Sequence, residues 1–167
     1  MDQAGNIVLI GMPGVGKSTV GVLLAKALSR QFLDTDVHIQ AREGCTLQRL
    51  IDTRGLSAFC ELEQRHILGL DVSGTVIATG GSVVYSAAAM AHLGRGGRIV
   101  HLRLDLPRLS RRITNQATRG IVMEPGQSLE GLYRQRRPLY EQYAQLSLDC
   151  QDLTQDQVVE RLLTMLG

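Results

Sequence analysis

Residues 11–18 read GMPGVGKS and match G-x-x-x-x-G-K-[ST], the pattern of a phosphate-binding P-loop. An apolar run at 6–10 precedes the motif, and apolar residues recur at helical spacing over 17–29 behind it. In such a loop, backbone N–H groups and the helix N-terminus face phosphate oxygens. A glycine-rich turn matching by chance is the alternative, but the full match between a strand and a helix argues against it. The stretch therefore predicts a nucleotide site.

The residue types in this loop suggest a part for each side chain. We expect Lys17 to reach the β- and γ-phosphates of ATP and the Ser18 hydroxyl to bind Mg²⁺, which needs only one or two protein ligands. ATP and Mg²⁺ are thus the predicted cofactors. The predicted ATP site comprises Gly14, Val15, Gly16, Lys17, Ser18 and Thr19.

The rest of the chain alternates between strand-like and helix-like segments. Strands are predicted at 6–10, 75–78, 98–104 and 146–149, and residues 32–33 are predicted to end a further strand. Helices are predicted at 17–29, 37–42, 47–53, 57–70, 87–93, 107–113, 129–143 and 154–166. Strands separated by helices pair in parallel through crossover connections, so we expect an α/β sandwich. No linker divides the chain, and residues 1–167 are predicted to form a single domain.

Composition excludes several classes of protein. The 167 residues carry a net charge of +2 without a basic run, which argues against a nucleic-acid partner. Three widely spaced cysteines indicate neither a disulfide framework nor a zinc site, and they suit a reducing cytoplasm. No leader-like or membrane-spanning apolar stretch is present. We expect a cytoplasmic monomer that acts on a small molecule, without membrane partners.

Carboxylates for metal and substrate are predicted at the end of the second strand. The chain lacks the N-K-x-D motif of GTPases, and the strand at 75–78 ends in TGGS without an acidic residue. Asp34 and Asp36 instead supply two carboxylates at the edge of the sheet where such folds bind ligands. A helix cap would explain one of them but not both.

These motifs together resemble the shikimate kinase family. The resemblance rests on GMPGVGKST, LDTD at 33–36, TGG at 79–81, Arg119 in a polar loop and RRPLY at 136–140, and it covers nearly the whole chain. It implies a three-layer α/β/α fold with a five-stranded parallel sheet, like nucleoside monophosphate kinases. It also implies a mobile lid at about 114–126 and a substrate-binding region at about 36–70. The polar, glycine-containing lid segment suits a loop that closes over the site.

The resemblance also implies roles for individual residues. On the ATP side, Asp34 would hold Mg²⁺ through water, Arg112 would support the adenine, and Arg119 would close over the transferring phosphate. Lys17, Asp36 and Arg119 are the predicted catalytic residues, since phosphoryl transfer needs positive charge and an oriented hydroxyl. Without the resemblance, Arg119 could equally be a solvated surface charge.

On the acceptor side, Asp36 would orient and deprotonate the attacking hydroxyl. Arg136 would clamp a carboxylate, and Gly80 and Gly81 would bring backbone N–H groups against the substrate. Of the three arginines at 134, 136 and 137, we expect one to be functional and the others to be solvated.

Two positions depart from the family pattern, and both are expected in the acceptor pocket. Cys60 stands where the family has an arginine that shares the substrate carboxylate, and Ser82 stands where it has a glycine. Losing one charge-assisted hydrogen bond of about 1.5 to 3 kcal/mol weakens binding by roughly ten- to a hundredfold. Arg54 or Arg65 are candidates to replace the missing cation. Cys60 itself is expected to pack rather than to act as a thiol.

The sequence therefore predicts an ATP-dependent small-molecule kinase with an alcohol acceptor in amino-acid biosynthesis. Because an acceptor with an ammonium group needs fewer cations, L-homoserine or a similar hydroxy amino acid is the main prediction. Shikimate is the first alternative, and a non-catalytic metabolite-binding regulator is another. A nucleoside monophosphate kinase is a weaker one.

Overall fold

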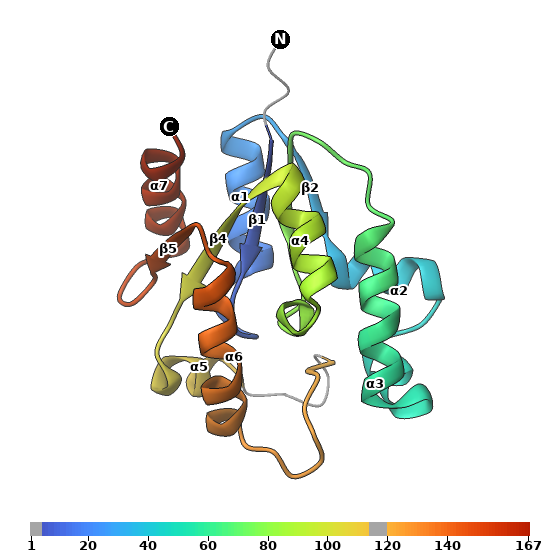
Figure 1. Cartoon of the computed structure of the whole chain (residues 1–167). Helices are drawn as coiled ribbons and strands as arrows, with labels where there is room; N and C mark the ends of the chain where they lie inside the picture. Colours follow the sequence, from blue (N-terminus) through green and yellow to red (C-terminus); the bar gives the residue numbers. More distant parts are fainter. Residues whose placement is uncertain (1–4, 114–119) are drawn as a thin grey trace.

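A computed structural model describes residues 5–113 and 120–167 of the chain. Its centre is a five-stranded sheet in which every described pairing is parallel. The strands lie in the order β2 (Gln31–Asp34), β3 (Thr75–Ala78), β1 (Asn6–Ile10), β4 (Gly97–Arg103) and β5 (Leu146–Asp149). All five residues of β1 are buried, because this apolar strand lies between β3 and β4 and is covered on both faces (Figure 1).

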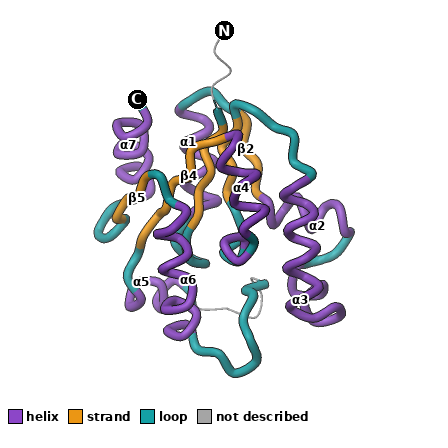
Figure 2. The backbone as a smooth tube through the Cα atoms, in the orientation of Figure 1, coloured by secondary structure: helices purple, strands orange, loops and turns teal. Residues whose placement is uncertain are grey.

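Helices cover the two faces of the sheet, as Figure 2 shows. Helix α1 (Lys17–Ala27) packs beside the C-terminal α7 (Gln155–Leu166) and against β3. Helix α4 (Ala87–Gly96) crosses from β3 to β4 and lies on the other face, as right-handed crossovers in opposite directions require. Helices α5 (Leu106–Arg112) and α6 (Leu129–Tyr143) connect β4 to β5. The predicted three-layer α/β/α fold with five parallel strands is therefore confirmed.

A second, smaller core lies beside the sheet. Helices α2 (Thr35–Glu43) and α3 (Leu47–Leu68) follow β2 and pack against each other. Most of their buried apolar residues form a cluster separate from the main core, made of Ile39, Leu47, Leu50, Phe59 and Leu62, whereas Ile67 near the end of α3 belongs to the main core. Figure 1 shows this pair of helices set to one side of the sheet. The predicted substrate-binding region at 36–70 thus corresponds to a structural unit with its own apolar interior.

The predicted break at Gly55 is present, although α3 continues across it. Gly55 adopts φ 81° and ψ 167°, which is not helical, so α3 consists of two helical segments joined at a kink. A positive φ of this kind favours glycine because it has no side chain to clash with its own backbone. In the described part of the chain, no helix is long and apolar enough to cross a membrane.

Candidate active site

A cavity of about 510 Å³ opens at the carboxyl ends of the parallel strands. Its walls come from the P-loop, the start of α2, the middle of α3, the turn after β3, residues 120–122 and α6. Ten residues of the predicted site line it, namely Gly14, Gly16, Lys17, Ser18, Thr19, Asp36, Gly80, Gly81, Arg112 and Arg136. The sheet topology therefore brings together residues that lie up to 122 positions apart in sequence.

The P-loop has the backbone that its glycines predict. Gly14 and Gly16 have φ values of 82° and 106°, and a Cβ on Gly14 would lie 2.8 Å from the Ile113 side chain. Gly16 is also the N-cap of α1, and within residues 5–113 and 120–167 no side chain caps this helix. Its first N–H groups are therefore directed toward the cavity without a side-chain partner, which is the arrangement that binds phosphate oxygens.

Lys17 lies folded against its own loop. Its Nζ donates hydrogen bonds to the carbonyl oxygens of Gly11 at 2.7 Å and Met12 at 3.0 Å, and the residue is only 8% exposed. Burial lowers the pKa of the Lys17 amine to about 8, an effect that the Asp36 carboxylate opposes. The ammonium is therefore held at the phosphate-binding loop beside the acceptor end of the cavity.

Ser18 and Asp34 meet at the edge of this loop. The Ser18 hydroxyl donates to Asp34 Oδ2 at 2.5 Å, while Asp34 Oδ1 accepts from the N–H groups of Asp36 and Val37. Asp34 is thus both the N-cap of α2 and the partner of Ser18, so capping and the predicted metal role are compatible. A hydroxyl and a carboxylate are hard oxygen ligands of the kind that Mg²⁺ prefers. These two side chains therefore fit the ion.

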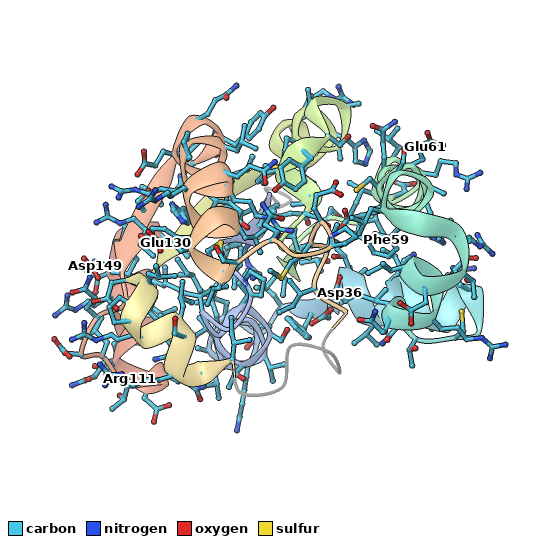
Figure 3. All side chains as sticks on the ribbon, turned by 90° about the horizontal axis from the view of Figure 1, so that it is seen from below. Asp36, Phe59, Glu61, Arg111, Glu130 and Asp149 are labelled. Carbon is cyan, nitrogen blue, oxygen red and sulfur yellow. The ribbon has the colours of Figure 1, made fainter. Side chains whose placement is uncertain are left out.

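Asp36 lies in the cavity wall at the first turn of α2. Burial raises the pKa of its carboxyl group to about 6, and the neighbouring Asp34 carboxylate adds to this effect. Figure 3 shows Asp36 and Phe59 on the inner side of α2 and α3, whereas Glu61 points outward from α3. At pH 7 the Asp36 carboxyl is still mostly ionised and can accept a proton or a hydrogen bond.

The turn after β3 differs in part from its predicted role. The N–H of Gly80 donates to Thr35 Oγ1 at 3.0 Å, so this group is already paired within the chain. What Gly80 contributes is space, because a Cβ there would lie 2.6 Å from Asp36 Oδ1. A Cβ on Gly81 would similarly lie 2.6 Å from Arg136 Nη1. The two glycines therefore let two polar side chains approach the cavity wall closely.

Burial distinguishes Arg136 from the other two arginines of α6. Arg136 is 1% exposed, and its guanidinium donates to the Tyr85 hydroxyl at 3.1 Å and to the Val122 carbonyl at 2.5 Å. Among the described residues it has no carboxylate ion-pair partner within 4 Å. The side chains of Arg134 and Arg137 are 77% and 58% exposed and pair with glutamates one turn along the helix. Arg136 is thus a buried cation that lines the cavity, and no carboxylate of the described residues pairs with it.

The remaining predicted arginines have different positions. Arg112 donates to the Val15 carbonyl at 3.1 Å and lines the cavity beside the P-loop. Arg119 and the first half of the predicted lid lie outside the described residues. Arg54 pairs with Glu43 at 3.3 Å, and Arg65 belongs with it to a different surface hollow. Neither of the two candidates therefore replaces the missing cation near Cys60.

The two departures from the family pattern are not equivalent in space. Ser82 is buried and lines the cavity, as expected, and its hydroxyl donates to Glu63 Oε2 at 2.7 Å. Cys60 is half-buried and does not line the cavity, although its neighbour Phe59 does. The prediction that Cys60 lies in the pocket wall is therefore wrong, because α3 turns the neighbouring Phe59 toward the cavity instead.

Glu63 is a buried acid that sequence reasoning missed; it does not line the cavity itself but accepts a hydrogen bond from Ser82, which does. It is 3% exposed, and burial raises the pKa of its carboxyl group to about 7. It lies on the apolar side of α3 together with Phe59, Leu62 and Ile67. A glutamate within such a stripe was the available signal, since an acid is rarely fully buried unless it has a partner or a function.

Comparisons with known proteins identify the family to which the chain is similar. A model of the shikimate kinase family matches residues 13–167. A shikimate kinase of Thiobacillus denitrificans is 36% identical over 152 residues, which cover 89% of this chain and 83% of that protein. The structure of a shikimate kinase from Acinetobacter baumannii in complex with shikimate matches with a TM-score of 0.91 at 28% identity, covering 99% of this chain and 94% of that one.

A more distant structure confirms the predicted likeness to nucleoside monophosphate kinases at the level of the fold. Thymidylate kinase from Candida albicans matches with a TM-score of 0.67 at 15% identity, covering 98% of this chain and 91% of that one.

Proposed function

The chain belongs to the shikimate kinase family of ATP-dependent small-molecule kinases, and on this premise we propose that it transfers the γ-phosphate of ATP to a hydroxyl group of shikimate. The kinase activity follows from membership of this enzyme family, whereas the identity of the acceptor is what we propose. The observation that supports it best is the buried Arg136 guanidinium, which lines the cavity without a carboxylate partner among the described residues. The carboxylate of shikimate would supply the missing counter-ion.

The geometry supports an in-line transfer in which Asp36 serves the attacking hydroxyl. The acceptor oxygen forms a bond to the γ-phosphorus while the bond to the β–γ bridging oxygen breaks, and ADP leaves. The proton of the hydroxyl passes to the Asp36 carboxylate, whose pKa of about 6 suits a base at neutral pH. Asp36 lies in the cavity wall next to the P-loop end that would present the phosphate.

Positive charge for the transition state comes from three sources in this proposal. Lys17 would turn from the Gly11 and Met12 carbonyls to the β- and γ-phosphates once ATP is bound. Arg119 would act from the lid, a role that rests on the family resemblance. Mg²⁺, held by Ser18 and through water by Asp34, would neutralise charge on the phosphate oxygens. Arg112 would contact the nucleotide beside the P-loop.

L-Homoserine, the main prediction from the sequence, is not supported by the comparisons, which favour the alternative, shikimate, and it becomes the second candidate acceptor. The observation in its favour is that Arg136 is the only arginine among the described residues on the acceptor side of the cavity, since Arg54 and Arg65 lie elsewhere. A hydroxy amino acid carries one carboxylate and one ammonium group, so it needs fewer cations than a purely anionic acceptor. The proteins of Thiobacillus denitrificans and Acinetobacter baumannii named above are nevertheless both shikimate kinases.

A coupled ADP-release assay with Mg-ATP and either shikimate or L-homoserine tests the proposal. We expect shikimate to stimulate ADP release well above the rate with ATP alone. The matched control is Lys17→Met, which should abolish the stimulation by either compound because the phosphates lose their cation. Stimulation by L-homoserine without stimulation by shikimate would reject shikimate as the acceptor while leaving the kinase activity in place.

A further inference from the structure

Tyr85 is an aromatic residue behind the cavity wall that none of the proposed steps uses. It is 38% exposed and ends the short helix η1 (Val83–Tyr85), which packs against α6. The Arg136 guanidinium lies over its ring, with Cζ 5.2 Å from the ring centroid. The Tyr85 hydroxyl also accepts the hydrogen bond from Arg136 Nε at 3.1 Å. One side chain therefore contacts the same guanidinium in two ways.

The backbone that carries Tyr85 is fixed on both sides. Val83 and Val84 come just before it, are each 1% exposed and belong to the main core. Ser86 follows directly, and its side chain caps helix α4. A residue between two such anchors has already lost most of its backbone freedom on folding, so it can hold a neighbour at little further cost in entropy. Tyr85 is thus a rigid support for Arg136.

The contacts of the guanidinium determine which of its nitrogens faces a ligand. Nε is engaged by the Tyr85 hydroxyl, and Nη2 donates to the Val122 carbonyl at 2.5 Å. Nη1 lies beside Gly81, where a Cβ would approach it to 2.6 Å, and Gly81 lines the cavity. An arginine can bind a carboxylate through Nε together with one Nη or through both Nη atoms. Because Tyr85 occupies Nε, a carboxylate in the cavity has to approach Nη1.

The ring of Tyr85 also stabilises the charge of Arg136. This guanidinium is 1% exposed and has no carboxylate partner within 4 Å among the described residues. A carboxylate of the chain at this place would pair with the guanidinium and compete with the acid group of the acceptor. An aromatic face attracts a cation without being a counter-ion, and the attraction is greater where water is excluded. Tyr85 therefore supports the buried charge and leaves it available to a ligand.

We propose that Tyr85 is a positioning residue, which holds the Arg136 guanidinium by its ring and its hydroxyl so that Nη1 meets the carboxylate of the acceptor. The inference rests on the proposed function, since it concerns recognition of the same acceptor. Because Tyr85 acts through Arg136, it matters for an acceptor with a free carboxylate and not for the same molecule without one. Tyr85 thereby sets how strongly the enzyme prefers an acid over its uncharged derivative.

The test compares shikimate with its methyl ester in the wild type, Tyr85→Phe and Tyr85→Leu. The phenylalanine keeps the ring and removes the hydroxyl, whereas the leucine removes both. KM for shikimate should rise roughly tenfold in Tyr85→Phe and roughly fiftyfold or more in Tyr85→Leu, with kcat and KM for ATP unchanged. The ester is measured as a competitor of shikimate, so that its Ki is obtained whether or not it is phosphorylated. This Ki should stay within about twofold in both variants, because the ester has no charge for Arg136 to bind.

Two further sets of variants control the comparison. Tyr143→Phe, at the end of α6 and outside the cavity wall, is the matched control and should change neither KM. If Tyr85 acts through Arg136, the double variant Tyr85→Leu/Arg136→Met has the same KM for shikimate as Arg136→Met alone, whereas multiplying effects overturn the positioning role. Thermal unfolding shows which variants are folded, and the conservative Tyr85→Phe suffices for the comparison of acid and ester.

The possible failures of the inference and of the proposed function differ. Unchanged KM for shikimate in both Tyr85 variants, or an equal loss of affinity for the acid and the ester, overturns the inference alone. If the wild type uses L-homoserine and not shikimate, the same comparison is made with that acid and its amide, and the same two results overturn the inference. Turnover of neither compound by the wild type rejects the proposed function and the inference with it.

Discussion

Replacing Arg136 by methionine removes the buried guanidinium while keeping a long side chain in its place. The substitution deletes the hydrogen bonds to the Tyr85 hydroxyl and the Val122 carbonyl, and it removes the only cation that we assign to the acceptor carboxylate. A charge-assisted hydrogen bond contributes about 1.5 to 3 kcal/mol, so KM for the acceptor should rise by roughly ten- to a hundredfold or more if the contact is bidentate. KM for ATP should stay within about twofold, since the P-loop is untouched.

The assay is ADP release with shikimate and ATP varied in turn, together with thermal unfolding to confirm that each variant is folded. Arg134→Met is the matched control, because Arg134 is on the same helix, is 77% exposed and pairs with Glu130. It should leave both KM values unchanged. A folded Arg136→Met variant whose acceptor KM equals that of the wild type would refute the assignment of Arg136 to the carboxylate. An equal rise in KM for ATP would place its role in the nucleotide site instead.

Four further predictions concern the same cavity. Asp36→Asn should lower kcat by roughly a hundredfold or more. Because burial raises the pKa of Asp36 to about 6, wild-type kcat/KM should fall as the pH drops below that value. A kcat/KM that is independent of pH between 5 and 8 would contradict the role of Asp36 as a base. The pKa of Glu63 is raised to about 7 from an ordinary 4.5, so the folded protein retains a proton that the unfolded chain releases, and stability is lost as the pH rises through that window. Glu63→Gln should accordingly raise the free energy of unfolding at pH 8 by roughly 1 to 3 kcal/mol in urea titrations, with no gain at pH 4. Gly80→Ala should raise KM for the acceptor at least tenfold in the ADP-release assay, since its Cβ would crowd Asp36 and Glu63, and an unaffected variant would show that nothing binds over this glycine. Ser18→Ala should increase the Mg²⁺ concentration needed for half-maximal activity, measured by Mg²⁺ titration at fixed ATP, and an unchanged Mg²⁺ dependence would exclude Ser18 as a ligand.

The order of elements was readable from the sequence because its signals are local. The apolar run at 6–10, the glycines of the P-loop and the helical spacing over 17–29 each depend on neighbours within one turn, and the structure confirms the elements they predict. The glycine at position 55 likewise predicted the break in the helix, since the positive φ found there favours glycine. The bounds of elements were less accurate, as with α2, which begins at Thr35 rather than at 37 because Asp34 caps it.

The acceptor side could be predicted only in part, because its geometry depends on pairs that are distant in sequence. That Arg136 rather than Arg134 or Arg137 would be buried depends on how α6 faces the turn after β3, and spacing alone left all three open. Glu63 and Ser82 are 19 residues apart, and nothing in either local sequence indicates their hydrogen bond. The same limit applies to Cys60. It does not line the cavity, and its spacing in the sequence could not show this.

Asp34 uses both of its carboxylate oxygens, and this affects how the metal site and the base are aligned. One of its oxygens fixes the start of α2 and the other reaches the P-loop serine, while Asp36 follows two residues later in the same helical turn. If Mg²⁺ is held there as proposed, two peptide units within one capped helical turn fix the distance between the metal and the base. A change that breaks the cap of α2 would then disturb the metal ligands and the base together.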